Sequence, residues 1–285
     1  MISFDNIKTI SVIGAGTMGS GIAQMAAMAG YKVFLFDIKK EATDKASDNI
    51  VKNLNGALER GKITEELKQT TLSNITYTTT LTDLVADVHI EAVLEKLDIK
   101  QKLFNDLAAF NSEESIFATN TSSIPITQIA AGVKGAERVI GMHFFNPAHI
   151  MKLVEVISGA ATSSKIADII KRLAEKMGKQ AVMAKDAPGF IVNRVARHFY
   201  VEGLKILEEN VASHEAIDEL VEASGFKMGP FKLMDLIGVD TNFSVTSSMY
   251  QSFHYDSKFR PNRIQQQKVD AGFHGRKSGK GFYEY

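Results

Sequence analysis

A histidine and a glutamate near the middle of the chain have residue types suited to proton transfer. His143 lies between a hydrophobic run and Pro147, and Glu155 follows twelve residues later between two valines. An imidazole titrates close to neutral pH, so it can accept or release a proton there. A buried carboxylate beside it would fix the ring's tautomer and stabilise its charged form. The pair predicts a general acid–base centre; the alternative is that His143 is a hydrogen-bonded core residue.

The segments that must hold this pair have the character of β-strands. His143 lies in the stretch 138–145 and Glu155 in the stretch 153–158. An acid among apolar neighbours needs a partner, which His143 would supply. Further strands are predicted, with helical stretches between them (96–110 is the clearest), at 75–79, 88–94, 115–119 and 180–184. Alternating strands and helices predict an α/β fold, Rossmann-like, with a doubly wound, mostly parallel sheet covered on both faces.

A polar cluster, Asn120-Thr121-Ser122-Ser123, follows the strand that precedes the histidine strand. Ligands of such sheets bind at the carboxyl ends of the strands. Ser122 could therefore donate a hydrogen bond to a substrate oxygen that also faces His143. The alternative for a Thr-Ser-Ser turn is helix capping. A serine nucleophile is disfavoured because no G-x-S-x-G sequence surrounds Ser122.

The N-terminal segment has the pattern of a dinucleotide-binding unit. A strand at 7–13 is followed by a glycine-rich turn, a helix ending near Gly30 and a strand at 31–36 that ends at Asp37; the turn is Gly14-Ala15-Gly16-Thr17-Met18-Gly19. The three glycines permit the tight turn, the approach of backbone N–H groups to a pyrophosphate, and close helix packing. Asp37 has the position expected for binding the ribose 2′-hydroxyl of NAD. NAD binding is predicted; the alternative is a glycine-rich turn in another α/β protein.

Two departures from a plain Rossmann pattern are expected. Residues 38–73 predict a projecting αα-hairpin, because Ile38 and the apolar residues after it recur every four positions until Gly61. Lys52 on this hairpin could meet a phosphate-bearing substrate, although a solvated face is the more usual role of helical charges. The second half is all-helical, with segments from 188, 213–223, 230–238, 239–253 and 262–271. We expect a Rossmann-like domain at 1–185 and a helical domain at 186–285.

Composition narrows the class of protein. Lys plus Arg and Asp plus Glu are equal at 33 each, which argues against nucleic-acid or membrane-surface binding. The chain has no cysteine, so disulfides, thiolate nucleophiles and cysteine metal sites are excluded. No His and carboxylate cluster has the spacing of a metal site. No apolar run approaches the length of a bilayer span. A soluble, cytoplasmic protein without a metal is expected.

The chain resembles the L-3-hydroxyacyl-CoA dehydrogenase family over essentially its whole sequence, and its length is similar to that of the stand-alone bacterial 3-hydroxybutyryl-CoA dehydrogenases. Besides the glycine turn and the 120–123 cluster, the resemblance rests on Gly141-Met142-His143-Phe144-Phe145-Asn146-Pro147, Met151-Lys152-Leu153-Val154-Glu155-Val156, Pro188-Gly189-Phe190-Ile191-Val192-Asn193-Arg194 and Gly279-Lys280-Gly281-Phe282-Tyr283.

The resemblance implies a role for each matching residue. The catalytic histidine falls on His143, its partner on Glu155, and the groups that orient the substrate on Ser122 and Asn193. The implied NAD contacts are Gly14, Ala15, Gly16, Thr17, Met18, Gly19, Asp37, Glu95, Lys100, Ser122, Asn146 and Lys277. The implied substrate is an acyl-CoA bound near the hairpin, and the implied assembly is a homodimer through the helical domain. Two alternatives are a dehydrogenase of a hydroxy acid without CoA, and a non-catalytic NAD-binding structural protein.

Overall fold

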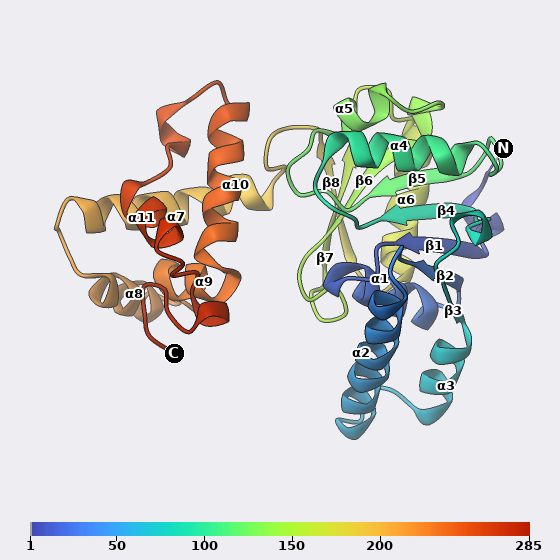
Figure 1. Ribbon diagram of the computed structural model, residues 1–285, viewed down its shortest axis with the longest axis horizontal. Helices are drawn as coiled ribbons and strands as arrows, with labels where there is room; N and C mark the ends of the chain where they lie inside the picture. The colour runs from blue at the N-terminus through green and yellow to red at the C-terminus, as the bar shows by residue number, and fades with distance from the viewer. Residues whose placement is uncertain (1) are drawn as a thin grey trace. The chain divides into compact units, whose positions relative to one another are not determined.

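An eight-stranded sheet organises the first of two units in the computed structural model, which describes residues 2–285. The first unit ends at Ala187, and the second is Pro188–Tyr285. The strand order is β3-β2-β1-β4-β5-β6-β7-β8 (Figure 1). The strands are β1 (Thr9–Ile13), β2 (Lys32–Phe36), β3 (Ile75–Thr78), β4 (Val88–Glu91), β5 (Ile116–Thr119), β6 (Val139–Phe144), β7 (Leu153–Ser158) and β8 (Gln180–Lys185).

Strand direction follows from what connects the strands. The pairs from β3 to β6 are parallel, β6 and β7 are antiparallel, and β7 and β8 are again parallel. Crossovers that contain a helix give parallel pairs, whereas the short helix-free connection 145–152 returns the chain in the opposite direction. The mostly parallel sheet predicted from the sequence is confirmed. The strand order reverses between β1 and β4, where ligands of such sheets bind.

Helices cover both faces of this sheet. They are α1 (Thr17–Met28), α2 (Lys40–Glu59), α3 (Glu65–Ser73), α4 (Leu97–Ala108), α5 (Ile126–Ala131) and α6 (Ser164–Lys176). Ile22 of α1 and Ile170 of α6 belong to one apolar core with Val12 of β1. On the other face, Phe104 of α4 lies against Phe117 of β5, with ring centroids 5.4 Å apart. Burial of both faces explains why strands such as β6 are buried along their whole length and consist mostly of apolar residues.

The predicted hairpin is present: α2 and α3 extend from the sheet (Figure 1). Ile50 and Leu54 of α2 are fully buried, and the Thr64 hydroxyl accepts a hydrogen bond from Leu67 N, which caps α3. The expectation that Ile38 begins the apolar stripe is wrong. Ile38 is 79% exposed and precedes α2, which begins at Lys40.

The second unit is helical, as expected, and has its own core. Its helices are α7 (Val192–Glu208), α8 (His214–Ala223), α9 (Pro230–Ile237), α10 (Val239–Ser252) and α11 (Arg263–Asp270). Tyr200, Phe231 and Phe282 meet in that core. The helix predicted from Pro188 begins later, because Gly189 and Phe190 have positive φ angles of 72° and 47°. Short 3₁₀ helices are η1 (Phe4–Asn6), η2 (Leu81–Asp83), η3 (Ala136–Arg138), η4 (Ser257–Phe259) and η5 (Arg276–Ser278).

Within residues 2–285, no helix combines the length and the apolar character that crossing a membrane requires.

Candidate active site

The glycine turn joins β1 to α1 in a conformation that only glycine can adopt at two of its positions. Gly14 has φ of 102°, and a Cβ there would lie 2.5 Å from the carbonyl oxygen of Ala92. A Cβ on Gly19 would lie 1.7 Å from the carbonyl oxygen of Gly14, so the start of α1 sits directly on the turn. These contacts set the helix N-terminus at the carboxyl end of β1.

Gly16 differs from its two neighbours in the motif. A Cβ on Gly16 would meet no protein atom within 4 Å. Gly16 is also the N-cap of α1, where backbone N–H groups and the helix dipole favour an anion. The outer side of the turn therefore offers open space and positive potential. These features fit the pyrophosphate of a dinucleotide.

Asp37 follows β2 and is hydrogen-bonded to the glycine turn. Its carboxylate accepts from Ala15 N at 2.9 Å and from Lys39 N at 3.1 Å. The carboxylate is half-buried, so part of it remains accessible to a ribose hydroxyl. Asp37 thus has a structural contact that the sequence motif did not indicate.

His143 and Glu155 are brought together by sheet pairing. They are directly opposite each other in the antiparallel register of β6 and β7. Nδ1 of His143 lies 2.8 Å from Oε2 of Glu155, and both side chains are buried. The ring of Phe145 is tilted against the imidazole, with centroids 4.6 Å apart. The expected carboxylate–imidazole pair is present, with a geometry that fixes the orientation of the ring.

The 120–123 cluster lies beside the histidine strand. Asn120 Oδ1 accepts from Phe144 N at 2.8 Å, which ties the end of β5 to the end of β6. The backbone N–H of Ser122 donates to Glu95 Oε1 at 3.1 Å. Asn146, exposed just after β6, precedes Pro147 through a cis peptide bond. Ser122 and Asn146 are therefore at neighbouring strand ends, as the topology predicted.

Glu95 and Lys100, both expected to contact NAD, form an ion pair of 3.1 Å. Lys100 also lies 2.6 Å from Glu91, and its side chain is 1% exposed. Burial by itself would raise the pKa of Glu95, but the Lys100 charge and hydrogen bonds from Thr121 and Ser123 hold it below its usual value. Glu91 was missed by the sequence reasoning; its only signal was a charged residue ending an apolar strand.

A hollow of about 930 Å³ lies beside the hairpin. Lys52, Arg60 and Lys62 line it together with Met25 and His149. Burial, reinforced by Lys179, lowers the pKa of His149. The hollow combines these three cations, and the carboxylates of Asp48 and Glu59, with an apolar wall; the cations suit a phosphate group and the wall an apolar part of a ligand. The described residues contain no group of three or more His, Asp or Glu side chains that could hold a metal ion.

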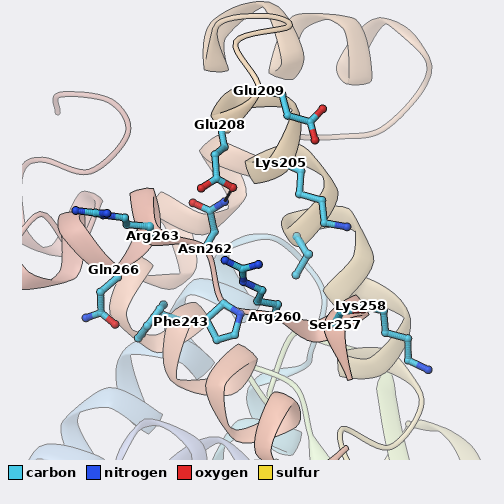
Figure 2. A pocket seen from close by; sticks show the side chains of 12 residues that line it. Lys205, Glu208, Glu209, Phe243, Ser257, Lys258, Arg260, Asn262, Arg263 and Gln266 are labelled. Carbon is cyan, nitrogen blue, oxygen red and sulfur yellow. Dashed lines mark hydrogen bonds between the residues drawn. The ribbon is translucent and has the colours of Figure 1, made fainter. Parts of the chain in front are cut away.

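Two expected site residues belong to the helical unit. Asn193 is the second residue of α7 and is half-buried. Lys277, in η5, forms an ion pair of 2.7 Å with Asp240. A separate hollow of about 670 Å³ in this unit is lined by side chains of both charges, and Asn262 there donates to Glu208 (Figure 2). Neither expected residue lines it, so it is distinct from the predicted site.

Comparison with known proteins matches both units. Residues 9–187 match the family model "3-hydroxyacyl-CoA dehydrogenase, NAD binding domain", and residues 189–285 match "3-hydroxyacyl-CoA dehydrogenase, C-terminal domain". The chain is 44% identical to the probable 3-hydroxybutyryl-CoA dehydrogenase of Bacillus subtilis strain 168, over 98% of each chain. It is 48% identical over 98% of its length to the 3-hydroxyadipyl-CoA dehydrogenase of Escherichia coli K12 and spans 59% of that longer protein.

Solved structures of dehydrogenases of this family are also similar to this chain. The (S)-3-hydroxybutyryl-CoA dehydrogenase PaaH1 from Ralstonia eutropha superposes with a TM-score of 0.95 at 39% identity, covering 98% of this chain and 99% of that one. The sequence resemblance, the sheet with its glycine turn and the helical unit thus agree. The chain belongs to the 3-hydroxyacyl-CoA dehydrogenase family, with that family's NAD-binding domain at its N-terminal side and its C-terminal domain after residue 188.

Proposed function

We propose that this chain catalyses reversible hydride transfer between NAD and C3 of an L-3-hydroxyacyl-CoA. A short acyl chain, as in 3-hydroxybutyryl-CoA and acetoacetyl-CoA, is the proposed substrate. The buried His143–Glu155 pair at 2.8 Å carries the proposal, because it supplies a base for the 3-hydroxyl proton. The names of the Bacillus subtilis and Ralstonia eutropha relatives support the short acyl chain.

The proposed chemistry divides between cofactor and protein. NAD, when bound, accepts or donates the hydride. His143 takes the hydroxyl proton at its ring during oxidation and returns it during reduction. Glu155 stabilises the imidazolium formed in between, and Ser122 and Asn193 orient the substrate's oxygen atoms. General acid–base assistance of this kind contributes about 10²–10⁴-fold to rate.

The cofactor site is proposed to consist of the glycine turn 14–19, Asp37, Glu95, Lys100, Ser122, Asn146 and Lys277. The open space over Gly16 and the accessible part of the Asp37 carboxylate support this set. For CoA, we propose the hollow beside α2, where Lys52 provides a cation for a phosphate group. The sequence proposes two domains, 1–185 and 186–285. All residues of the proposed NAD and CoA sites except Lys277 belong to the first of them.

A homodimer through the helical domain is also proposed. Large apolar side chains are exposed in this unit, and burying them against a second copy would remove apolar surface from water. They include Val195 at 69%, Val211 at 70%, Leu220 at 73% and Phe226 at 58% exposed. Light scattering on the purified chain tests this: a monomer at micromolar concentration would contradict it.

The deciding experiment follows NADH oxidation with acetoacetyl-CoA. Parallel reactions replace the thioester with free acetoacetate, and NADH with NADPH. We expect turnover with acetoacetyl-CoA and NADH, little with free acetoacetate, and a lower rate with NADPH. Turnover of free acetoacetate at the thioester's rate would favour a dehydrogenase of acids without CoA. Binding of NADH without turnover of either substrate would overturn the proposed function.

A further inference from the structure

Glu91 is a buried carboxylate that the proposed reaction does not use. It ends β4, and its side chain is 0% exposed. Its Oε1 accepts hydrogen bonds from Lys100 Nζ at 2.6 Å and Val93 N at 2.7 Å, and its Oε2 accepts one from Thr119 Oγ1 at 2.6 Å. A carboxylate out of water is costly unless it is paired in this way. Such complete pairing indicates that Glu91 fixes its partners.

Lys100 connects Glu91 to a second carboxylate. The ammonium group lies 2.6 Å from Glu91 and 3.1 Å from Glu95 Oε2. Its side chain is 1% exposed, so the bridge is shielded from water. Glu95 is 37% exposed and lies after the end of β4, outside the sheet. Strand pairing therefore does not hold the Glu95 side chain, whereas its contact with Lys100 does.

Glu95 in turn holds the turn that carries Ser122. Its Oε1 accepts from Ser122 N at 3.1 Å, from Ser123 N at 3.2 Å and from Ser123 Oγ at 3.0 Å, and the Thr121 hydroxyl also donates to it. From the other side, Thr119 is opposite Glu91 in the parallel register of β4 and β5. The turn is thus tied to Glu91 at its start by Thr119 and further along by Lys100 and Glu95.

We propose that Glu91 is a positioning residue: through Lys100 and Glu95 it fixes the turn 121–123 and hence Ser122. The link from Glu91 to the turn stands on these hydrogen bonds and ion pairs alone, whereas its effect on rate rests on the proposed function. Neutralising Glu91 leaves Lys100 with one carboxylate, which loosens Glu95 and the backbone N–H groups that it accepts from.

The first test needs no substrate. Hydrogen–deuterium exchange is compared in the full-length wild type, in Glu91→Gln and in the matched control Asp87→Asn. Asp87 precedes the other end of β4, and its carboxylate accepts from Thr9 N and Oγ1, each at 2.9 Å. In Glu91→Gln we expect exchange across 119–125 to accelerate about tenfold or more by local opening. Wild-type exchange there, or equal acceleration in Asp87→Asn, would overturn the proposal.

The second test separates positioning from general destabilisation. Glu91→Gln should lower kcat for acetoacetyl-CoA reduction about 100-fold, a loss typical of a misplaced group. In a Ser122→Ala background the same change should cost about tenfold or less, because Ser122 is already gone and only the effect on Lys100 and Glu95 of the proposed NAD site remains. Losses that multiply fully would overturn the link to Ser122. Asp87→Asn should keep wild-type kcat.

Two provisions keep this test decisive. If Glu91→Gln does not fold, Glu91→Asp keeps the charge but withdraws the carboxylate from Lys100, and the same changes in smaller size are expected. If the wild type does not reduce acetoacetyl-CoA, the proposed function fails, and the exchange measurement alone decides whether Glu91 fixes the turn.

Discussion

At the scale of single residues, the site depends on which groups can hold a charge inside the fold. The His143 ring has the carboxylate of Glu155 at 2.8 Å, whereas His89, also buried, has the Ser11 hydroxyl at 2.7 Å from its Nδ1. The Glu155 carboxylate holds the His143 ring in one orientation, whereas burial lowers the pKa of His89 and so favours its neutral ring. Two histidines on neighbouring parts of one sheet thus suit different roles, and residue type alone does not distinguish them.

Replacing His143 tests the proton-transfer role directly. His143→Asn should lower kcat by about 10²–10⁴-fold, because no base remains for the 3-hydroxyl, while the dissociation constant for NADH stays within about threefold of wild type. Glu155→Gln should lower kcat less, since the base is retained. Steady-state kinetics and fluorescence titration with NADH provide both numbers. A parallel loss of NADH affinity in His143→Asn would contradict the assignment.

Burial of His89 predicts a pH effect on stability. Burial lowers the pKa of His89 to about 4 from 6.5, so between these values the unfolded chain binds a proton that the folded chain does not. Stability should therefore fall as pH drops from about 6.5 towards 4, by at most about 3 kcal/mol from this residue. Urea unfolding at several pH values should show a shallower decline in His89→Gln. Identical declines would mean that other groups cause the effect.

At the scale of elements, sequence periodicity predicted the strands and helices well because burial on both faces leaves an unmistakable apolar pattern. The strand expected at 153–158 has those bounds in the structure, whereas the one expected at 88–94 ends at Glu91. There the apolar run continues after the sheet has ended, so hydrophobicity misleads. The Glu91–Lys100 pair was not predicted, because it depends on where α4 crosses back over the sheet.

Two glycines of one turn should respond differently to alanine. Gly16→Ala adds a methyl group to open space, so the unliganded chain should keep its stability, while NADH affinity falls at least about tenfold because the methyl group occupies the phosphate's place. Gly19→Ala drives the methyl group into the Gly14 carbonyl and should destabilise folding itself. Thermal unfolding with and without NADH distinguishes the two. Unchanged NADH affinity in Gly16→Ala would move the phosphate site elsewhere.

At the scale of the whole molecule, the chain consists of two units with separate cores. In the helical unit, the C-terminal segment is hydrogen-bonded to helix α9. Asp235 of α9 is buried and accepts from Phe282 N and Tyr283 N, each at 2.9 Å, and from the Tyr285 hydroxyl at 3.1 Å. A Cβ on Gly281 would lie 2.1 Å from this carboxylate, which explains why a glycine precedes the two aromatic residues.

Removing that carboxylate should therefore destabilise one unit selectively. Asp235→Ala leaves the buried N–H of Phe282 and the part-buried N–H of Tyr283 without this acceptor and should cost about 3 kcal/mol or more, a typical value for a broken buried network. Since the Rossmann-like core shares none of these contacts, peptides from β1 to β6 should keep their protection in hydrogen–deuterium exchange, while those of α7–α11 lose theirs. Equal loss of protection in both units would show that they unfold as one cooperative body. The stability of the helical unit would then depend on the first unit.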